Sequence, residues 1–285
     1  LAFPGRSQIF PQPIQTTRRS LHGPRGRFCL GSWPTSYRNR GLASLIRLSN
    51  RWDRKLGSPN TDPVQNMPDL TLLSLLCSKL CHDLVGPISA VGNGVEILED
   101  EDDPDMRRQA IELLAHSAEL AANRLKFMRL AFGAAGGEGA AISLSEARQT
   151  AADFLADGRG ELAWASAPDE SDLGPDKTGI KILLNLILIA NDAIPRGGTV
   201  GVVLRRVESD GRATVQASIK AEGTGARLGD GVEAAFDLTG SAIELNPKSA
   251  PASLAANLAD SYGRVISVMP GVESVEFSVE LLPAQ

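Results

Sequence analysis

The feature of this 285-residue chain that most constrains its fold is a helical period of apolar residues between positions 73 and 98. The members of this apolar stripe are Leu73, Leu76, Leu80, Leu84, Ile88, Val91, Val95 and Leu98. Steps of three and four place such residues on one face of an α-helix, so we expect a helix over residues 68–99. Residues 105–132 repeat the period and predict a second helix, with Asp103 as its N-cap and Pro104 as its first residue.

Two amphipathic helices joined by a short turn make a hairpin that cannot bury both of its apolar faces alone. Pairing two hairpins across a two-fold axis buries these faces in a four-helix bundle. We therefore expect residues 67–133 to form a helical hairpin through which the protein becomes a homodimer.

The remainder of the chain mixes helical and strand patterns. A glycine-rich linker over residues 134–142 leads into a capping box, Ser143 to Glu146, which opens a helix ending near residue 156. Further helices are expected at 176–194 and 250–262, and strands at 161–166, 199–207, 212–220, 264–269 and 275–282. The chain is therefore expected to be α+β, with the hairpin followed by an α/β sandwich over residues 143–285. In that sandwich, helices pack on one face of a mostly antiparallel sheet.

The first 66 residues differ in composition from the rest. They hold eleven Lys and Arg side chains and two Asp, whereas the whole chain has a formal net charge of −5. The apolar residues of this basic leader follow no helical or strand period and cannot form a buried core, so we expect the leader to be disordered. Such segments can be transit peptides or nucleic-acid-binding arms. However, residue 1 is Leu, and Met67 directly precedes the helical pattern. We therefore expect the native protein to start at Met67 and the leader to be an upstream translation artefact.

The cysteines bear on the compartment. Cys29, Cys77 and Cys81 form neither a CxxC motif nor a metal-ligand spacing, so we expect no metal site within this chain. Free thiols are typical of a reducing compartment. Because we find no apolar run approaching the roughly 20 residues that span a bilayer, we expect a cytoplasmic protein without a membrane segment.

His82 is the candidate functional residue. At 100° per residue it lies about 200° from the stripe residues on either side, so its ring should point away from the stripe, toward water or a partner. Its neighbours on that outer face, Gly86, Ser89 and Asn93, are small or polar and leave an open surface. By this geometry alone, a single histidine is more often an ordinary surface residue than a site.

The residues that follow His82 carry a more specific signal. The pattern His-Asp-Leu-x-x-Pro-Ile, residues 82–88, resembles the phospho-acceptor box of two-component histidine kinases. The longer run Cys-His-Asp-Leu-Val-Gly-Pro-Ile-Ser-Ala-Val-Gly-Asn-Gly-Val-Glu, residues 81–96, is similar to ChpT-type histidine phosphotransferases of alphaproteobacteria. The resemblance covers residues 67–285.

This resemblance implies roles for individual residues. His82 would be the phosphorylated residue, Asp83 would support it, and the small outer-face residues Gly86, Ser89 and Asn93 would contact a docked receiver domain. Pro87 lacks an N–H, so the carbonyl of Asp83 loses its partner within the helix, which should bend there. The bend is either simply tolerated or softens the helix around His82.

Residues 143–285 resemble the ATP-binding domain of histidine kinases, the Bergerat fold, but depart from it at three motifs. The aligned N box has Ile189 where an Asn helps to hold Mg²⁺, and the adenine-reading box has Ala221 in place of an Asp. The lid region, residues 249–254, lacks the expected glycines and contains Pro251. We therefore expect a degenerate domain that binds no nucleotide and holds no cofactor, with Mg²⁺ supplied by a partner receiver domain.

The function implied by the resemblance is that of a histidine phosphotransferase in a two-component phosphorelay, which takes a phosphoryl group from a receiver Asp and passes it to the Asp of a response regulator. ChpT-type proteins take it from a CckA-like hybrid kinase and deliver it to CtrA-like and CpdR-like cell-cycle regulators, so these are the implied partners. Nucleic-acid and membrane partners are not expected. Two alternatives stay open: an ATP-dependent histidine kinase, and a non-catalytic dimer that sequesters response regulators.

Overall fold

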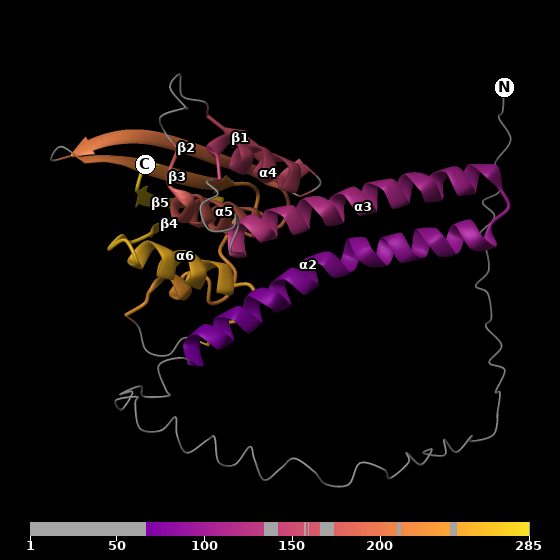
Figure 1. Cartoon of the computed structure of the whole chain (residues 1–285), viewed down its shortest axis with the longest axis horizontal. Helices are drawn as coiled ribbons and strands as arrows, with labels where there is room; N and C mark the ends of the chain where they lie inside the picture. Colours follow the sequence, from indigo (N-terminus) through magenta and orange to yellow (C-terminus); the bar gives the residue numbers. More distant parts are fainter. Residues whose placement is uncertain are drawn as a thin grey trace, which may run out of the picture. The chain divides into compact units, whose positions relative to one another are not determined.

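A computed structural model of the chain describes residues 67–133, 142–156, 158, 160–165, 174–209, 212–239 and 244–284. The predictions made for the leader and for nearly all of the linker fall outside these residues. The described residues belong to one compact unit, in which a helical hairpin precedes an α/β domain (Figure 1).

The hairpin consists of α2 (Met67–Asp100) and α3 (Pro104–Phe132), which lie side by side in Figure 1. The turn between them is held by side chains. Asp103 Oδ1 accepts a hydrogen bond from the Asp105 N–H at 3.0 Å, and Pro104 is the first helical residue, as predicted. The Arg107 guanidinium donates to the carbonyls of Leu98 and Glu101, so it ties the start of α3 to the end of α2.

The apolar stripe of α2 is buried only in part. Leu76 is buried, whereas Leu73 and Ile88 expose 58% and 57% of their surface. One neighbouring helix covers one side of a helix, so the outer half of the stripe faces away from α3. By length and composition, Leu70–Asp100 is also apolar enough to cross a membrane. The expectation that no segment of this kind exists is therefore wrong on those two criteria, because isolated polar residues within α2 do not lower its average hydropathy enough.

The α/β domain is built on a five-stranded sheet in the order β1-β2-β3-β5-β4. The strands are β1 (Gly160–Trp164), β2 (Gly198–Ser209), β3 (Arg212–Glu222), β4 (Ser267–Gly271) and β5 (Ser274–Leu281). Only the β1–β2 pair is parallel, and the other three pairs are antiparallel. The sheet is thus mostly antiparallel, as predicted, although β4 begins three residues later than expected.

Three helices, α4 (Leu144–Ala156), α5 (Lys177–Asp192) and α6 (Ala250–Asp260), accompany the sheet, together with the short 3-10 helix η2 (Ala234–Phe236). Helix α5 is central, because every residue from Ile182 to Ala190 is buried. It packs against β2, β3 and β5 on one side and against its helical neighbours on the other. A helix buried all round needs no amphipathic pattern, which explains the continuous apolar run in its sequence.

The C-terminal end of α3 is anchored in the core of the α/β domain. The rings of Phe127 and Phe154 stack with centroids 4.1 Å apart, which joins α3 to α4. Asn185 of α5, fully buried, donates from Nδ2 to the Ala131 carbonyl at 3.0 Å. These contacts hold the hairpin against the α/β domain, and they bring the middle of α2 close to the end of α5.

Candidate functional site

The ring of His82 projects from α2 into solvent, with 83% of its side-chain surface exposed. The expected orientation, away from the apolar stripe, is therefore confirmed. Its Nδ1 lies 3.0 Å from Asp83 Oδ1. A carboxylate can only accept a hydrogen bond, so Nδ1 is the donor in this contact, and in the neutral form of the ring the lone pair is then on Nε2. An exposed, unprotonated ring nitrogen is a nucleophile that a protein partner can reach.

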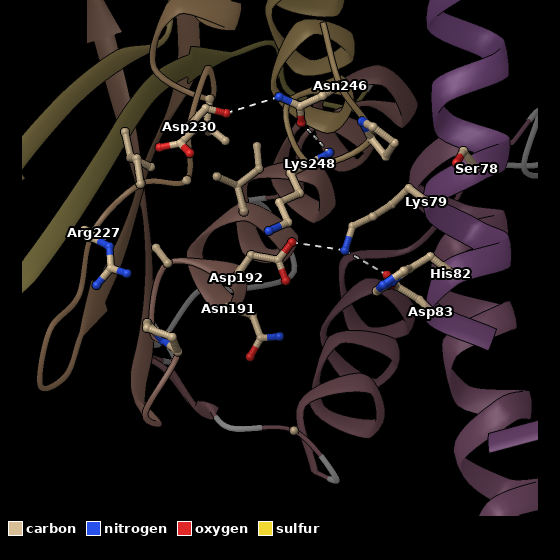
Figure 2. Close-up of a pocket in the computed structure, with 18 of the residues that line it drawn as sticks. Ser78, Lys79, His82, Asp83, Asn191, Asp192, Arg227, Asp230, Asn246 and Lys248 are labelled. Atoms are coloured by element: carbon tan, nitrogen blue, oxygen red, sulfur yellow. Dashed lines mark hydrogen bonds and ion pairs between the residues drawn. The ribbon is translucent and has the colours of Figure 1, made fainter. Parts of the chain in front are cut away.

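The Asp83 carboxylate is held from its other side by Lys79, one helical turn earlier in α2. Lys79 Nζ lies 2.8 Å from Asp83 Oδ2 and 3.0 Å from Oδ2 of Asp192, the last residue of α5 (Figure 2). Burial alone disfavours the Lys79 ammonium, but the two carboxylates outweigh that effect and raise the pKa of Lys79 above its usual value of 10.5. Lys79 is therefore a charged, buried link between the hairpin and the α/β domain.

Arg124 of α3 supplies the hydrogen-bond donor that Pro87, which has no N–H, cannot supply within α2. Its Nη1 donates to the backbone carbonyl of Asp83, which has no N–H partner at residue 87. Figure 1 shows that the α2 ribbon changes direction partway along its length, as expected for a helix with an internal proline. The carbonyl predicted to lose its partner thus has a new one, and this contact fixes the backbone beside His82.

A cleft of about 980 Å³ lies beside His82, between α2 and the α/β domain (Figure 2). Its α2 wall includes Ser78, Lys79, His82 and Asp83, and Arg124 of α3 also borders it. The opposite wall comes from the end of α5 and from the segments that flank η2. The residues on that wall include Ile189, Asn191, Asp192, Arg227, Asp230, Asn246 and Lys248. The cleft therefore carries charges of both signs next to the imidazole.

The other site residues predicted from the sequence lie outside this cleft. Gly86, Ser89 and Asn93 are all exposed and follow His82 along α2, one to three turns further on. A side chain at Gly86 would meet nothing within 4 Å, so the surface there is open. The structure thus brings His82 and Asp83 to the cleft and leaves the three small outer-face residues on an accessible strip beyond it.

The positions aligned with a kinase nucleotide site are apolar. Ile189 is 3% exposed and Ala221 is fully buried, and neither side chain has an oxygen or nitrogen atom to offer a ligand. Asn185, the first residue of the N box, uses its amide to hold the α3 carbonyl described above. In the lid region, Pro251 is buried in the first turn of α6. Among the described residues, no group of three His, Cys, Asp or Glu side chains could hold a metal ion.

Sequence reasoning missed three residues of this site, Lys79, Arg124 and Asp192. The spacing of Lys79 and Asp83, four residues apart on a helix, was a local signal for an ion pair. No comparable signal connects Lys79 with Asp192 or Arg124 with Asp83, because those contacts join residues that are distant in the sequence.

Comparisons with known proteins agree with this geometry. A family model described as the histidine phosphotransferase C-terminal domain matches residues 144–273. The protein phosphotransferase ChpT of Brucella abortus (strain 2308) is 41% identical over 150 residues, which are 51% of this chain and 66% of that protein, just under two thirds. A solved structure of a bacterial phosphotransferase is 32% identical, with a TM-score of 0.60, and the match covers 74% of this chain and 96% of that chain. The expected α+β fold class, a helical hairpin followed by an α/β sandwich, is confirmed.

Proposed function

Because the chain belongs to the ChpT-type histidine phosphotransferase family, we propose that His82 accepts a phosphoryl group from the aspartyl phosphate of one receiver domain and passes it to an Asp of another. The observation that carries this proposal is the ring itself. It is exposed beside an open cleft, and its Nδ1 is bound to Asp83 so that Nε2 is available.

The transfer proceeds in two displacements. Nε2 of His82 attacks the phosphorus atom, the N–P bond forms, and the bond from phosphorus to the donor's carboxylate oxygen breaks. The ring then carries a positive charge, which the Asp83 carboxylate at Nδ1 stabilises. In the second displacement the acceptor's carboxylate attacks the same phosphorus atom and the neutral ring leaves. Mg²⁺ held by each receiver would neutralise charge on the phosphoryl group.

Docking of a receiver would use the strip of α2 beyond His82 together with the cleft. The exposed positions Gly86, Ser89 and Asn93 allow a partner to approach without steric obstruction. On the family resemblance, we propose the receiver of a CckA-like hybrid kinase as donor and CtrA-like and CpdR-like regulators as acceptors. Asp83 supports transfer in both directions through its contact with Nδ1 of the ring.

We also propose that the protein works as a homodimer. The outer face of the hairpin exposes large apolar side chains, namely Leu70, Leu73, Val85, Ile88 and Val95 of α2 and Met106, Ile111, Leu113 and Leu125 of α3. Soluble monomers rarely leave so extended an apolar surface in water. A second hairpin related by a two-fold axis would cover it in a four-helix bundle. His82 lies on another side of α2 and would stay accessible.

A cytoplasmic location fits the structure better than a membrane location does. The segment of α2 that is long enough to span a bilayer has Lys79, His82 and Asp83 near its middle. Charged side chains are costly inside a bilayer, and Lys79 already pairs with Asp192 of the α/β domain. The exposed thiols of Cys77 and Cys81 fit a reducing compartment.

The test is to mix the purified protein with a phosphorylated receiver domain and to locate acid-labile phosphate by peptide mass spectrometry. We expect it at His82, and none in a His82→Gln variant. His116→Gln, which changes the exposed histidine of α3, is the matched control and should be labelled like the wild type. Full relay activity in His82→Gln would overturn the proposal and favour the non-catalytic dimer.

Incubation with labelled ATP and Mg²⁺, without a receiver, separates the phosphotransferase from an ATP-dependent kinase. Neither Ile189 nor Ala221 offers a polar side-chain atom to a nucleotide, so we expect no label on the protein. Autophosphorylation of His82 from ATP would replace the proposed function with that of a histidine kinase.

A further inference from the structure

The imidazole of His82 is connected to the α/β domain through three side chains. His82 Nδ1 lies 3.0 Å from Asp83 Oδ1, and the second oxygen of that carboxylate, Oδ2, lies 2.8 Å from Lys79 Nζ. The same ammonium is 3.0 Å from Oδ2 of Asp192. Figure 2 shows Lys79 reaching across from α2 to Asp192, with Asp83 and His82 on its other side. Each carboxylate oxygen of Asp83 therefore has one specific partner, which leaves the group a single orientation.

The burial of these groups makes the arrangement rigid. The Lys79 side chain is 8% exposed and that of Asp83 is 16% exposed, although both lie next to a ring that is almost entirely in solvent. A long lysine side chain loses much of its rotamer freedom when it is fixed. Its second carboxylate partner, Asp192, offsets that cost and keeps the ammonium charged. The Asp192 side chain is 44% exposed and can be substituted with little disturbance of the core.

We propose that Lys79 is a positioning residue for phosphoryl transfer: anchored by Asp192, it fixes the Asp83 carboxylate so that His82 keeps its proton on Nδ1 and presents Nε2. This inference rests on the proposed function for its kinetic part, but the state of the ring can be measured without any transfer. The proposed role of Lys79 also gives the α/β domain a part in the reaction, because Asp192 of α5 acts on the imidazole through Lys79 and Asp83.

The first test measures the tautomer of His82. Long-range ¹H–¹⁵N spectra at about pH 8, where an ordinary imidazole is neutral, distinguish the Nδ1–H from the Nε2–H form. His82→Gln assigns the signals. We expect the Nδ1–H form to predominate in the wild type and the two forms to mix in Lys79→Met, which keeps the aliphatic stem and removes the ammonium. A ring that stays in the Nδ1–H form in Lys79→Met overturns the inference.

The second test measures single-turnover transfer from a phosphorylated receiver at increasing receiver concentration. In Lys79→Met we expect the maximal rate to fall about tenfold, equivalent to about 1.4 kcal/mol, with the half-saturating concentration unchanged. Lys220→Met is the matched control, because it removes a lysine of β3 that pairs with Glu222 away from the cleft. An altered half-saturating concentration with an unchanged maximal rate would mean that Lys79 contacts the receiver, and would contradict a positioning role.

Asp192→Asn keeps the test valid if Lys79→Met does not fold. We expect a smaller fall in maximal rate, about threefold, as for one partly exposed ion pair. Because Asp192 acts through Lys79, the double variant should be no slower than Lys79→Met alone. Losses that multiply, or no loss in Asp192→Asn, would overturn the inference. If wild-type protein acquires no phosphate at His82, the proposed function fails instead, and the tautomer measurement still decides the positioning role.

Discussion

Replacing Arg124 with Met should destabilise the hairpin, because the backbone carbonyl of Asp83 loses its hydrogen-bond donor. Pro87 has no N–H, so the Asp83 carbonyl lacks its normal partner within α2, and the Arg124 guanidinium donates to it from α3. Met keeps the aliphatic stem but donates no hydrogen bond. The carbonyl beside the phosphotransfer site would then depend on water alone.

The size of the effect follows from this geometry. A hydrogen bond that involves a charged group contributes about 1.5–3 kcal/mol. Arg124 is half-buried, so water can replace part of the bond, and we expect Arg124→Met to lower the free energy of unfolding by about 1–2 kcal/mol. Pro87→Ala restores an N–H that can donate to the same carbonyl. In that background, Arg124→Met should cost about 0.5 kcal/mol or less.

Chemical denaturation followed by circular dichroism gives the free energies of unfolding of the wild type, Arg124→Met, Pro87→Ala and the double variant. The protein concentration must be held constant, since dimerisation would couple stability to it. Arg108→Met is the matched control, because it removes an exposed arginine that pairs only loosely with Asp105. It should change stability by less than about 0.5 kcal/mol. An equal cost of Arg124→Met with and without Pro87 would refute the role assigned to this contact.

Four further predictions concern other parts of the chain. Burial and the hydrogen bond to Asp176 raise the pKa of Tyr262 to about 12. The stability it contributes should be complete below the ordinary tyrosine pKa and be lost as pH rises toward 12, and Tyr262→Phe should abolish this dependence in denaturation measured against pH. Gly198→Ala should destabilise the protein by more than about 2 kcal/mol, because its Cβ would lie 2.0 Å from a carbonyl oxygen of β3. Gly86→Ala, in open space within α2, should instead stabilise it by about 0.5–1 kcal/mol in the same assay. Ile88→Asp should convert the proposed dimer into a monomer in light scattering, and a wild-type monomer would contradict that assembly.

Local patterns in the sequence were enough to predict much of this structure. The position of His82 opposite the apolar stripe and the N-cap at Asp103 depend on residues a few positions apart, where the geometry of a helix fixes the outcome. Strands β2 and β3 were predicted for the same reason, because the alternation of apolar and polar residues along a strand is a local signal.

The contacts that complete the site could not be predicted in this way. Lys79 and Asp192 are more than a hundred residues apart, and Arg124 reaches Asp83 from the other helix of the hairpin. Such pairs depend on how α3 and α5 pack, which is decided by buried residues such as Asn185. Likewise, how much of the apolar stripe is exposed depends on which neighbours cover it, and not on its period.

The most direct test of the central claim is a relay time course with one labelled donor receiver, this protein, and an acceptor receiver added later. The account predicts that label leaves the donor, accumulates at His82, and moves from there to the acceptor's Asp, with every step absent in His82→Gln. Transfer between the two receivers that proceeds equally well with His82→Gln, or label that never reaches residue 82 in the wild type, would contradict it.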